Sequence, residues 1–228
     1  MNFLSHVAVV EPVRDSLVIA GAVLPDLLRH VGLRHHRAPD TDGGLSEDAR
    51  RVLQGIKYHV DADAFFHYCP WFGQTLKGLQ QSMAAEGNPL ANHWSRWLLP
   101  HVLIEIVLDA HIAEVRPDLP RVLYDSLQDF ARHECCPEVC ELYEADPDRL
   151  RELIGILIGH RRVESYNTTA GVADALRRVL ARGRKKVLSA ADERLLDSPI
   201  AWLRERLRNG EDIILIVREG IFSVDISR

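Results

Sequence analysis

The chain has 228 residues, of which 46% are hydrophobic and 27% are charged, and its formal net charge is −5. This is ordinary globular composition, and the length suits one domain with a sizeable core. The acidic balance excludes the basic footprint typical of a nucleic-acid-binding protein. The longest apolar run, Leu17–Leu24, is eight residues, whereas a transmembrane helix needs roughly 20.

The N-terminal segment and the cysteines favour a cytoplasmic location. Met1–His6 has no basic segment ahead of an apolar stretch, so it lacks the pattern of a signal peptide. The four cysteines are Cys69, Cys135, Cys136 and Cys140. Three of them crowd together, which suits neither a disulfide framework nor a standard zinc ribbon. We expect thiols packed near the start of a helix.

Helix signals punctuate the chain and strand alternation is nearly absent, so the fold class is mainly α, a single-domain helical bundle over 1–228. In chain order we expect helices over 2–10, from Asp15 or Ser16 towards 31, over 46–67, 70–87 and 92–115, after Pro117, Pro137 and Pro147, and over 189–209. Residues 34–46 are expected to form a flexible loop. The Ile- and Val-rich segment 212–226 fits either a short β hairpin or a helix.

Polar residues interrupt the apolar segment 97–113 at a regular interval. His101, Glu105 and Asp109 follow the i, i+4, i+8 spacing that places side chains on one helix face. The rest of the helix is apolar all round, so we expect it to be buried, with Trp97 in the core. Because an unpaired buried carboxylate costs roughly several kcal/mol, both acids must meet cations or protons inside the fold.

We call such a set of polar residues at i, i+4 and i+8 a ladder. A second ladder lies in 55–67 and consists of His59, Asp63 and His67. If the two ladders face each other, their imidazoles and carboxylates form ligands suited to zinc, iron or manganese. The alternative is hydrogen bonding between histidines and carboxylates that only fixes helix register. Eight residues of helix rise about 12 Å, so one ion cannot take ligands from both ends of a ladder.

We therefore expect one or two ions. His59, Asp63 and Asp109 are the favoured ligands, and His101 and Glu105 are further ligands or a general base. Two isolated polar residues in apolar segments, His6 and Asp26, are expected to join the same site, although each alone would suit a structural role. The predicted metal ligands are thus His6, Asp26, His59, Asp63, His67, His101, Glu105 and Asp109.

Three short stretches carry a resemblance to a known family. They are Met-Asn-Phe-Leu-Ser-His ending at His6, Gly-Ala-Val-Leu-Pro-Asp ending at Asp26, and Gly-Ile-Lys-Tyr-His-Val-Asp-Ala-Asp, which contains His59 and Asp63. In order and spacing they resemble acyl carrier protein phosphodiesterases, and the likeness continues more loosely to Asp109. The adjacent His-Asp pair typical of the related HD phosphohydrolases does not occur in the sequence.

This resemblance implies a helical, HD-phosphohydrolase-like fold and a divalent metal, commonly manganese or magnesium. The implied activity is hydrolysis of a phosphodiester, the release of 4′-phosphopantetheine from holo-acyl carrier protein. The full pattern of ligand-type residues is also similar to zinc-dependent phospholipase C-like helical proteins, which accounts better for His67, His101 and Glu105. Both resemblances imply a metal-dependent phosphoric diester hydrolase that uses Mn, Mg, Zn or Fe.

In such an enzyme the ion would polarise a phosphoryl oxygen, and Glu105 or Asp63 would accept a proton. Arg161 and Arg162 fit a bidentate clamp on the phosphate, or else a solvated helix end. The sequence has no Gly-x-Ser-x-Gly, no His-Glu-x-x-His and no Glu-x-x-His.

The alternative interpretation of the sequence is a non-catalytic helical module whose metal or polar core is structural. An acyl carrier protein partner would be acidic, so the enzyme reading also requires a basic docking surface. The residues available for it are Arg177, Arg178, Arg182, Arg184, Lys185 and Lys186.

Overall fold

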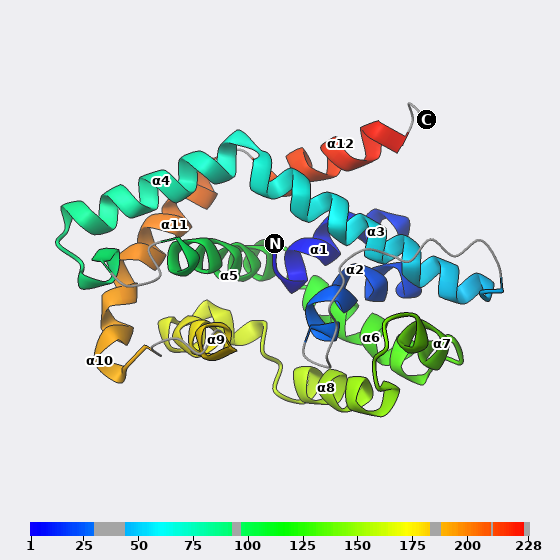
Figure 1. Cartoon of the computed structure of the whole chain (residues 1–228). Coiled ribbons are helices and arrows are strands. Elements are labelled where there is room, and N and C mark those ends of the chain that lie inside the picture. The colour runs from blue at the N-terminus through cyan, green and yellow to red at the C-terminus, as the bar shows by residue number, and fades with distance from the viewer. Residues whose placement is uncertain (30–43, 93–96, 183–187, 211, 226–228) are drawn as a thin grey trace. The chain divides into compact units, whose positions relative to one another are not determined.

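The computed structural model describes residues 1–29, 44–92, 97–182, 188–210 and 212–225. Within these ranges the chain forms helices and no strand, so the mainly α fold class is confirmed. The α-helices, shown in Figure 1, are α1 Phe3–Val10, α2 Ser16–Leu28, α3 Glu47–Tyr68, α4 Pro70–Ala85, α5 Leu98–Val115, α6 Leu119–Arg132, α7 Cys135–Leu142, α8 Pro147–Gly159, α9 Thr169–Arg182, α10 Ala190–Glu193, α11 Asp197–Asn209 and α12 Ile213–Asp225. Among the described residues, no helix combines the length and the apolar character that a membrane span requires.

The helices group into two compact units, and each unit is assembled from segments that alternate along the chain. The first unit consists of 1–66, 117–161 and 214–228, and the second consists of 67–116 and 162–213. The first therefore contains α1, α2, α6, α7, α8 and almost all of α3 and α12. The second contains α4, α5, α9, α10 and α11. No single linker separates two continuous halves of the chain.

Side-chain caps start the helices where the sequence predicts them. Asp15 accepts hydrogen bonds from the backbone amides of Leu17 and Val18 at the start of α2, at 2.9 and 3.2 Å. Asp146 caps α8 in the same way, and Ser189 with Asp192 forms a capping box at α10. The single helix predicted over 189–209 is instead divided into α10, a 3-10 helix at Arg194–Leu196 and α11. Most of the loop predicted at 34–46 lies outside the described residues. Its last residue, Ser46, caps α3 through its hydroxyl group.

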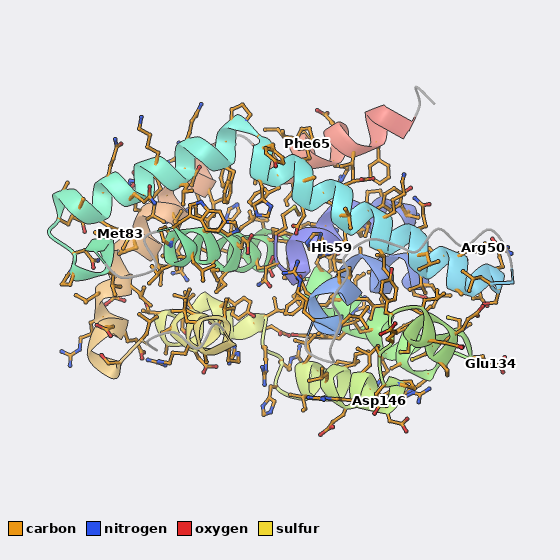
Figure 2. All side chains as sticks on the ribbon, in the orientation of Figure 1. Arg50, His59, Phe65, Met83, Glu134 and Asp146 are labelled. Atoms are coloured by element: carbon orange, nitrogen blue, oxygen red, sulfur yellow. The ribbon has the colours of Figure 1, made fainter. Side chains whose placement is uncertain are left out.

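The predicted alternatives for the C-terminal segment are resolved in favour of a helix. Residues 213–225 form α12, so a β hairpin there is wrong. The buried side chains Ile214, Val217 and Ile221 recur at i, i+3 and i+7, the period of one helix face rather than of a strand. Gly220 lets this helix approach α3 closely, because a Cβ there would overlap the ring of Phe65, which Figure 2 labels.

The core of the first unit forms where α6 packs against α1, α2 and α8 (Figure 1). Leu123, Leu127 and Phe130 supply the buried face of α6. The prediction for the cysteines is also confirmed at α7: Cys135 and Cys136 are free and buried at its start, and Cys140 is free and buried further along the same helix. The fourth cysteine, Cys69, is also buried and free. Burial raises the pKa of the Cys135 thiol to about 11, so this group is an unreactive packing element.

In the second unit α5 packs against α4, α9 and α11. Between Leu99 and Ile112 its large apolar side chains are buried, as the sequence predicts, whereas Val115 at its end is exposed. Asp109 is buried among the buried apolar side chains with no exposed surface. Trp97, which precedes the helix, is 58% exposed, so its predicted place in the core is wrong.

Two glycines allow α2 and α3 to cross with their backbones nearly in contact. A Cβ on Gly21 would overlap the carbonyl oxygen of Val52, and a Cβ on Gly55 would overlap that of Val18. A Cβ on Gly55 would also lie 2.9 Å from the Cα of Gly21. Since real Cβ atoms do not come this close to backbone atoms, no larger residue fits at either position without separating the helices.

We predict that Gly55→Ala lowers the free energy of unfolding by about 3 kcal/mol, because the added methyl group forces α2 and α3 apart. Urea denaturation followed by circular dichroism measures this change. The matched control is Gly155→Ala on α8, where a Cβ meets no atom within 4 Å. That change should leave stability within about 1 kcal/mol or raise it, since alanine favours the helix. Equal effects of the two substitutions would contradict the packing argument.

Candidate metal centres

Six of the eight predicted metal ligands come together in two groups of three. In each group one nitrogen or oxygen atom per residue lies within 4.8 Å of the other two. We call them the His59 triad, in the first unit, and the His101 triad, in the second. The His59 triad consists of His6, His59 and Asp63, and the His101 triad of His67, His101 and Glu105. Each offers two imidazoles and one carboxylate, a set that binds divalent transition metals.

The His59 triad is built by α1 and α3. The rings of His6 and His59 stack with centroids 3.9 Å apart and planes at 18°. Asp63 lies one turn after His59, with its Oδ1 3.4 Å from Nε2 of His6 and its Oδ2 3.8 Å from Nε2 of His59. The two imidazole rings therefore face the same carboxylate.

The backbone of α2 sets the orientation of His59. Nδ1 of His59 donates a hydrogen bond to the carbonyl oxygen of Ala22 at 2.8 Å, one residue after Gly21 of the glycine crossing. Because a carbonyl can only accept, Nδ1 carries the proton and Nε2 keeps its lone pair. Burial, and then the neighbouring His6, lower the pKa of His59 well below its ordinary value. The ring is thus neutral and oriented as in a metal-binding histidine.

His6 is a buried polar side chain without hydrogen bonds among the described residues. It is 1% exposed, and neither of its ring nitrogens has a hydrogen-bond partner among the described residues. Its Nε2 lies near Asp63 but lacks the alignment of a hydrogen bond. Leaving such a buried group unpaired costs about 1–3 kcal/mol. A bound cation would remove this cost by accepting a nitrogen lone pair.

Asp26 belongs to the same electrostatic neighbourhood. Its Oδ2 is buried without a hydrogen-bond partner in the described part of the chain. Burial raises the pKa of Asp26; His6 opposes this rise and the charge of Asp63 adds to it. The predicted ligand Asp26 thus lies in the electrostatic surroundings of the His59 triad, and its role as a ligand stays a prediction.

The amino group of Met1 also takes part, which sequence reasoning missed. It donates a hydrogen bond to Oδ1 of Asp63 at 2.6 Å. Although burial favours protonation, His6 and the Met1 amino group hold the pKa of Asp63 well below its usual range. Asp63 is thus an ionised carboxylate that already contacts one cation.

The His101 triad is more compact. Nε2 of His67 and Nε2 of His101 each lie 3.0 Å from Oε1 of Glu105, and the two nitrogens are 3.1 Å apart. Although burial raises the pKa of Glu105, hydrogen bonds from the two histidines contribute to holding it well below its usual range. The carboxylate is therefore ionised, and the three donor atoms form a nearly equilateral triangle.

Aromatic rings enclose the His101 triad. Phe72 on α4 packs edge-to-face with both imidazoles, with centroid distances of 5.1 Å to His67 and 5.0 Å to His101. The exposed ring of Trp97 lies 4.4 Å from the ring of His101. Trp97 precedes His101 by four residues, so the i, i+4 spacing was the available sequence signal for this neighbour.

The other predicted site residues are not joined to a triad by these contacts. Asp109 is buried on α5, one turn beyond Glu105, and its ligand role stays a prediction. Arg161 is exposed with a left-handed φ of 42° at the end of α8. Arg162 is half-buried, and its carbonyl oxygen accepts a hydrogen bond from Ser165. Their role as a phosphate clamp also stays a prediction.

We predict that the metal-free protein loses stability as the pH falls from about 7 to 5. In the unfolded chain His59 binds a proton near pH 6.5, whereas the folded protein keeps it neutral, so acid favours unfolding. His59→Gln should flatten this pH dependence. Urea denaturation in the presence of a chelator measures it, and His160→Gln, at an exposed position, is the control. An unchanged slope in His59→Gln would show that this histidine is not kept neutral by the fold.

Comparison with known proteins does not assign this chain to a family. No family model, no curated protein and no solved structure matches the chain. The two triads therefore rest on their own residues, distances and burial.

Proposed function

We propose that this protein is a divalent-metal-dependent phosphodiester hydrolase whose ion is bound by His6, Asp26, His59 and Asp63. The observation that carries the proposal is the buried His6, whose nitrogens lack hydrogen-bond partners among the described residues while its ring stacks on His59. A buried imidazole left in this state beside two carboxylates is accounted for by a cation that they share.

The donor set fits such an ion. Two neutral imidazoles with carboxylates favour Mn, Fe or Zn, whereas Mg prefers oxygen ligands and water. The hydrogen bond from His59 to Ala22 is the type of outer contact that orients a ligating histidine. When bound, the cation would supply Lewis-acid polarisation of a phosphoryl oxygen and a more acidic water.

Asp63 and Asp26 have pKa values shifted in opposite directions, so they suit different roles. Asp63 has a strongly lowered pKa, so it is a weak proton acceptor and is better suited to holding a cation. Asp26 has a pKa raised by burial, so it is the better candidate for the proton acceptor. The side chain of Asp63 is 25% exposed, which gives solvent and a substrate a route to the otherwise buried cluster.

The substrate class comes from the resemblance. His6, Asp26, His59 and Asp63 are the residues that match motif positions of acyl carrier protein phosphodiesterases, and they are the residues that share this neighbourhood. We therefore propose a phosphodiester substrate, with release of 4′-phosphopantetheine from acyl carrier protein as the specific reaction to test.

The structure describes the side chains of two residues of the predicted basic docking surface for acyl carrier protein, and the role of this surface stays a prediction. Arg177 pairs with Glu193 at 2.6 Å, and Arg178 pairs with Asp174. The side chains of 182 and 184–186 lie outside the described part.

One observation favours the non-catalytic module as the second candidate. The Met1 amino group already balances the charge of Asp63, so a polar core without metal has one of its charges paired. The His101 triad, in turn, agrees with the residue pattern of zinc-dependent phospholipase C-like proteins. Metal content and turnover separate these candidates.

We predict that Asp63→Asn loses both bound metal and phosphodiesterase activity, the activity by about a hundredfold or more, because a ligating charge is removed. Elemental analysis measures the metal, and release of nitrophenolate from bis-p-nitrophenyl phosphate measures the activity. Release of 4′-phosphopantetheine from holo-acyl carrier protein tests the specific substrate.

Asp61→Asn is the matched control, because Asp61 is an exposed carboxylate on the same helix that faces Lys57. It should retain metal and turnover. If Asp63→Asn also retains both, the proposed function is wrong. If metal is lost but the wild-type protein has no activity on either substrate, the structural module is the better interpretation.

A further inference from the structure

We propose that the His101 triad binds a divalent transition-metal ion of its own, held on one face by Nε2 of His67, Nε2 of His101 and Oε1 of Glu105. This inference does not rest on the proposed function, because it uses none of the residues assigned there. It concerns a complete set of three donors within the second unit.

The inference rests on the distances between the three donor atoms. An ion that binds nitrogen and oxygen at about 2.1 Å with right angles between bonds separates adjacent donor atoms by about 3.0 Å. A tetrahedral ion would separate them by about 3.4 Å. The observed edges are 3.0, 3.0 and 3.1 Å. The spacing therefore matches three neighbouring positions of an octahedron.

Hydrogen bonding accounts for two of the three edges, because each Nε2–H can donate to Oε1 of Glu105, but it does not account for the 3.1 Å approach of the two nitrogens. Each neutral imidazole has one N–H, and an ionised carboxylate has none. One Nε2–H of His67 cannot point along two edges at once, towards His101 and towards Glu105. If the protons sit on the Nδ1 atoms instead, three lone-pair-bearing atoms face one another. A cation in the middle accepts all three.

The surroundings agree with an ion that has open positions. Two histidines and one carboxylate on a face are the ligand set of non-haem iron sites, and they also suit manganese and zinc. His67 has 28% of its side chain exposed, so solvent reaches the triad.

Trp97 supplies a local reporter. Its ring lies 4.4 Å from that of His101, so a paramagnetic ion in the triad would quench its fluorescence. The experiment is a titration of the metal-stripped full chain with Co²⁺, followed by tryptophan emission and by the visible absorption of the bound ion. In the wild type we expect saturable quenching that Trp97→Phe removes while Co²⁺ is still bound.

His67→Gln should weaken the quenching-linked Co²⁺ affinity by at least about tenfold, since losing a ligand costs no less than losing its outer contact. His67 is the most exposed member of the triad, so this variant is expected to fold, and circular dichroism checks it. Glu105→Gln is the second variant, since it removes the charge and keeps the side-chain size. His111→Gln, a half-buried position outside the triad on the same helix, should change nothing.

The variants His59→Gln and Asp63→Asn separate this site from the proposed catalytic one. Both should keep the Trp97 quenching if the His101 triad binds its own ion. Quenching that disappears in these variants would overturn the inference, because the ion would then depend on the other residues. Wild-type affinity in both His67→Gln and Glu105→Gln, or a wild-type protein without Trp97-dependent quenching, would overturn it as well.

Discussion

The hydrogen bond from Nδ1 of His59 to the carbonyl oxygen of Ala22 depends on how closely two helix backbones approach. Gly21 and Gly55 permit that approach, and one turn of α3 then places the histidine against α2. The same contact fixes the tautomer of the ring and leaves Nε2 available. The two glycines thus permit the helix contact that orients the His59 ring and fixes its tautomer.

The helical ladders could be predicted from sequence because spacing along a helix fixes a face. That argument placed His59, Asp63 and His67 on one side of α3, and His101 and Glu105 on one side of α5. It could not predict which partners each end of a ladder meets, because partner choice depends on how the helices pack. In the structure His59 and Asp63 meet His6, whereas His67 meets His101 and Glu105.

The features missed by sequence are those without a local signal. The pairing of the Met1 amino group with Asp63 spans 62 positions of the chain, and no spacing rule predicts it. Trp97 is a large apolar residue of the type that often lies in a core. It is exposed here, where it precedes the buried part of α5. The helical state of 213–225 could not be decided from the sequence, because β-branched residues also suit strands. In the structure this segment is a helix that approaches α3 closely at Gly220.

The buried carboxylates are accommodated in three different physical ways. Asp63 is ionised and paired with an ammonium group, Glu105 is ionised between two imidazoles, and Asp26 responds to burial with a raised pKa. Each of these interactions stabilises an acid, whereas His6 lies 3.4 Å from the carboxylate of Asp63 without a hydrogen bond among the described residues. Since that imidazole keeps both nitrogens without a hydrogen bond in the described structure, it carries a desolvation cost of about 1–3 kcal/mol. A ligand that binds His6 releases this cost, which favours binding there over binding to an exposed surface histidine.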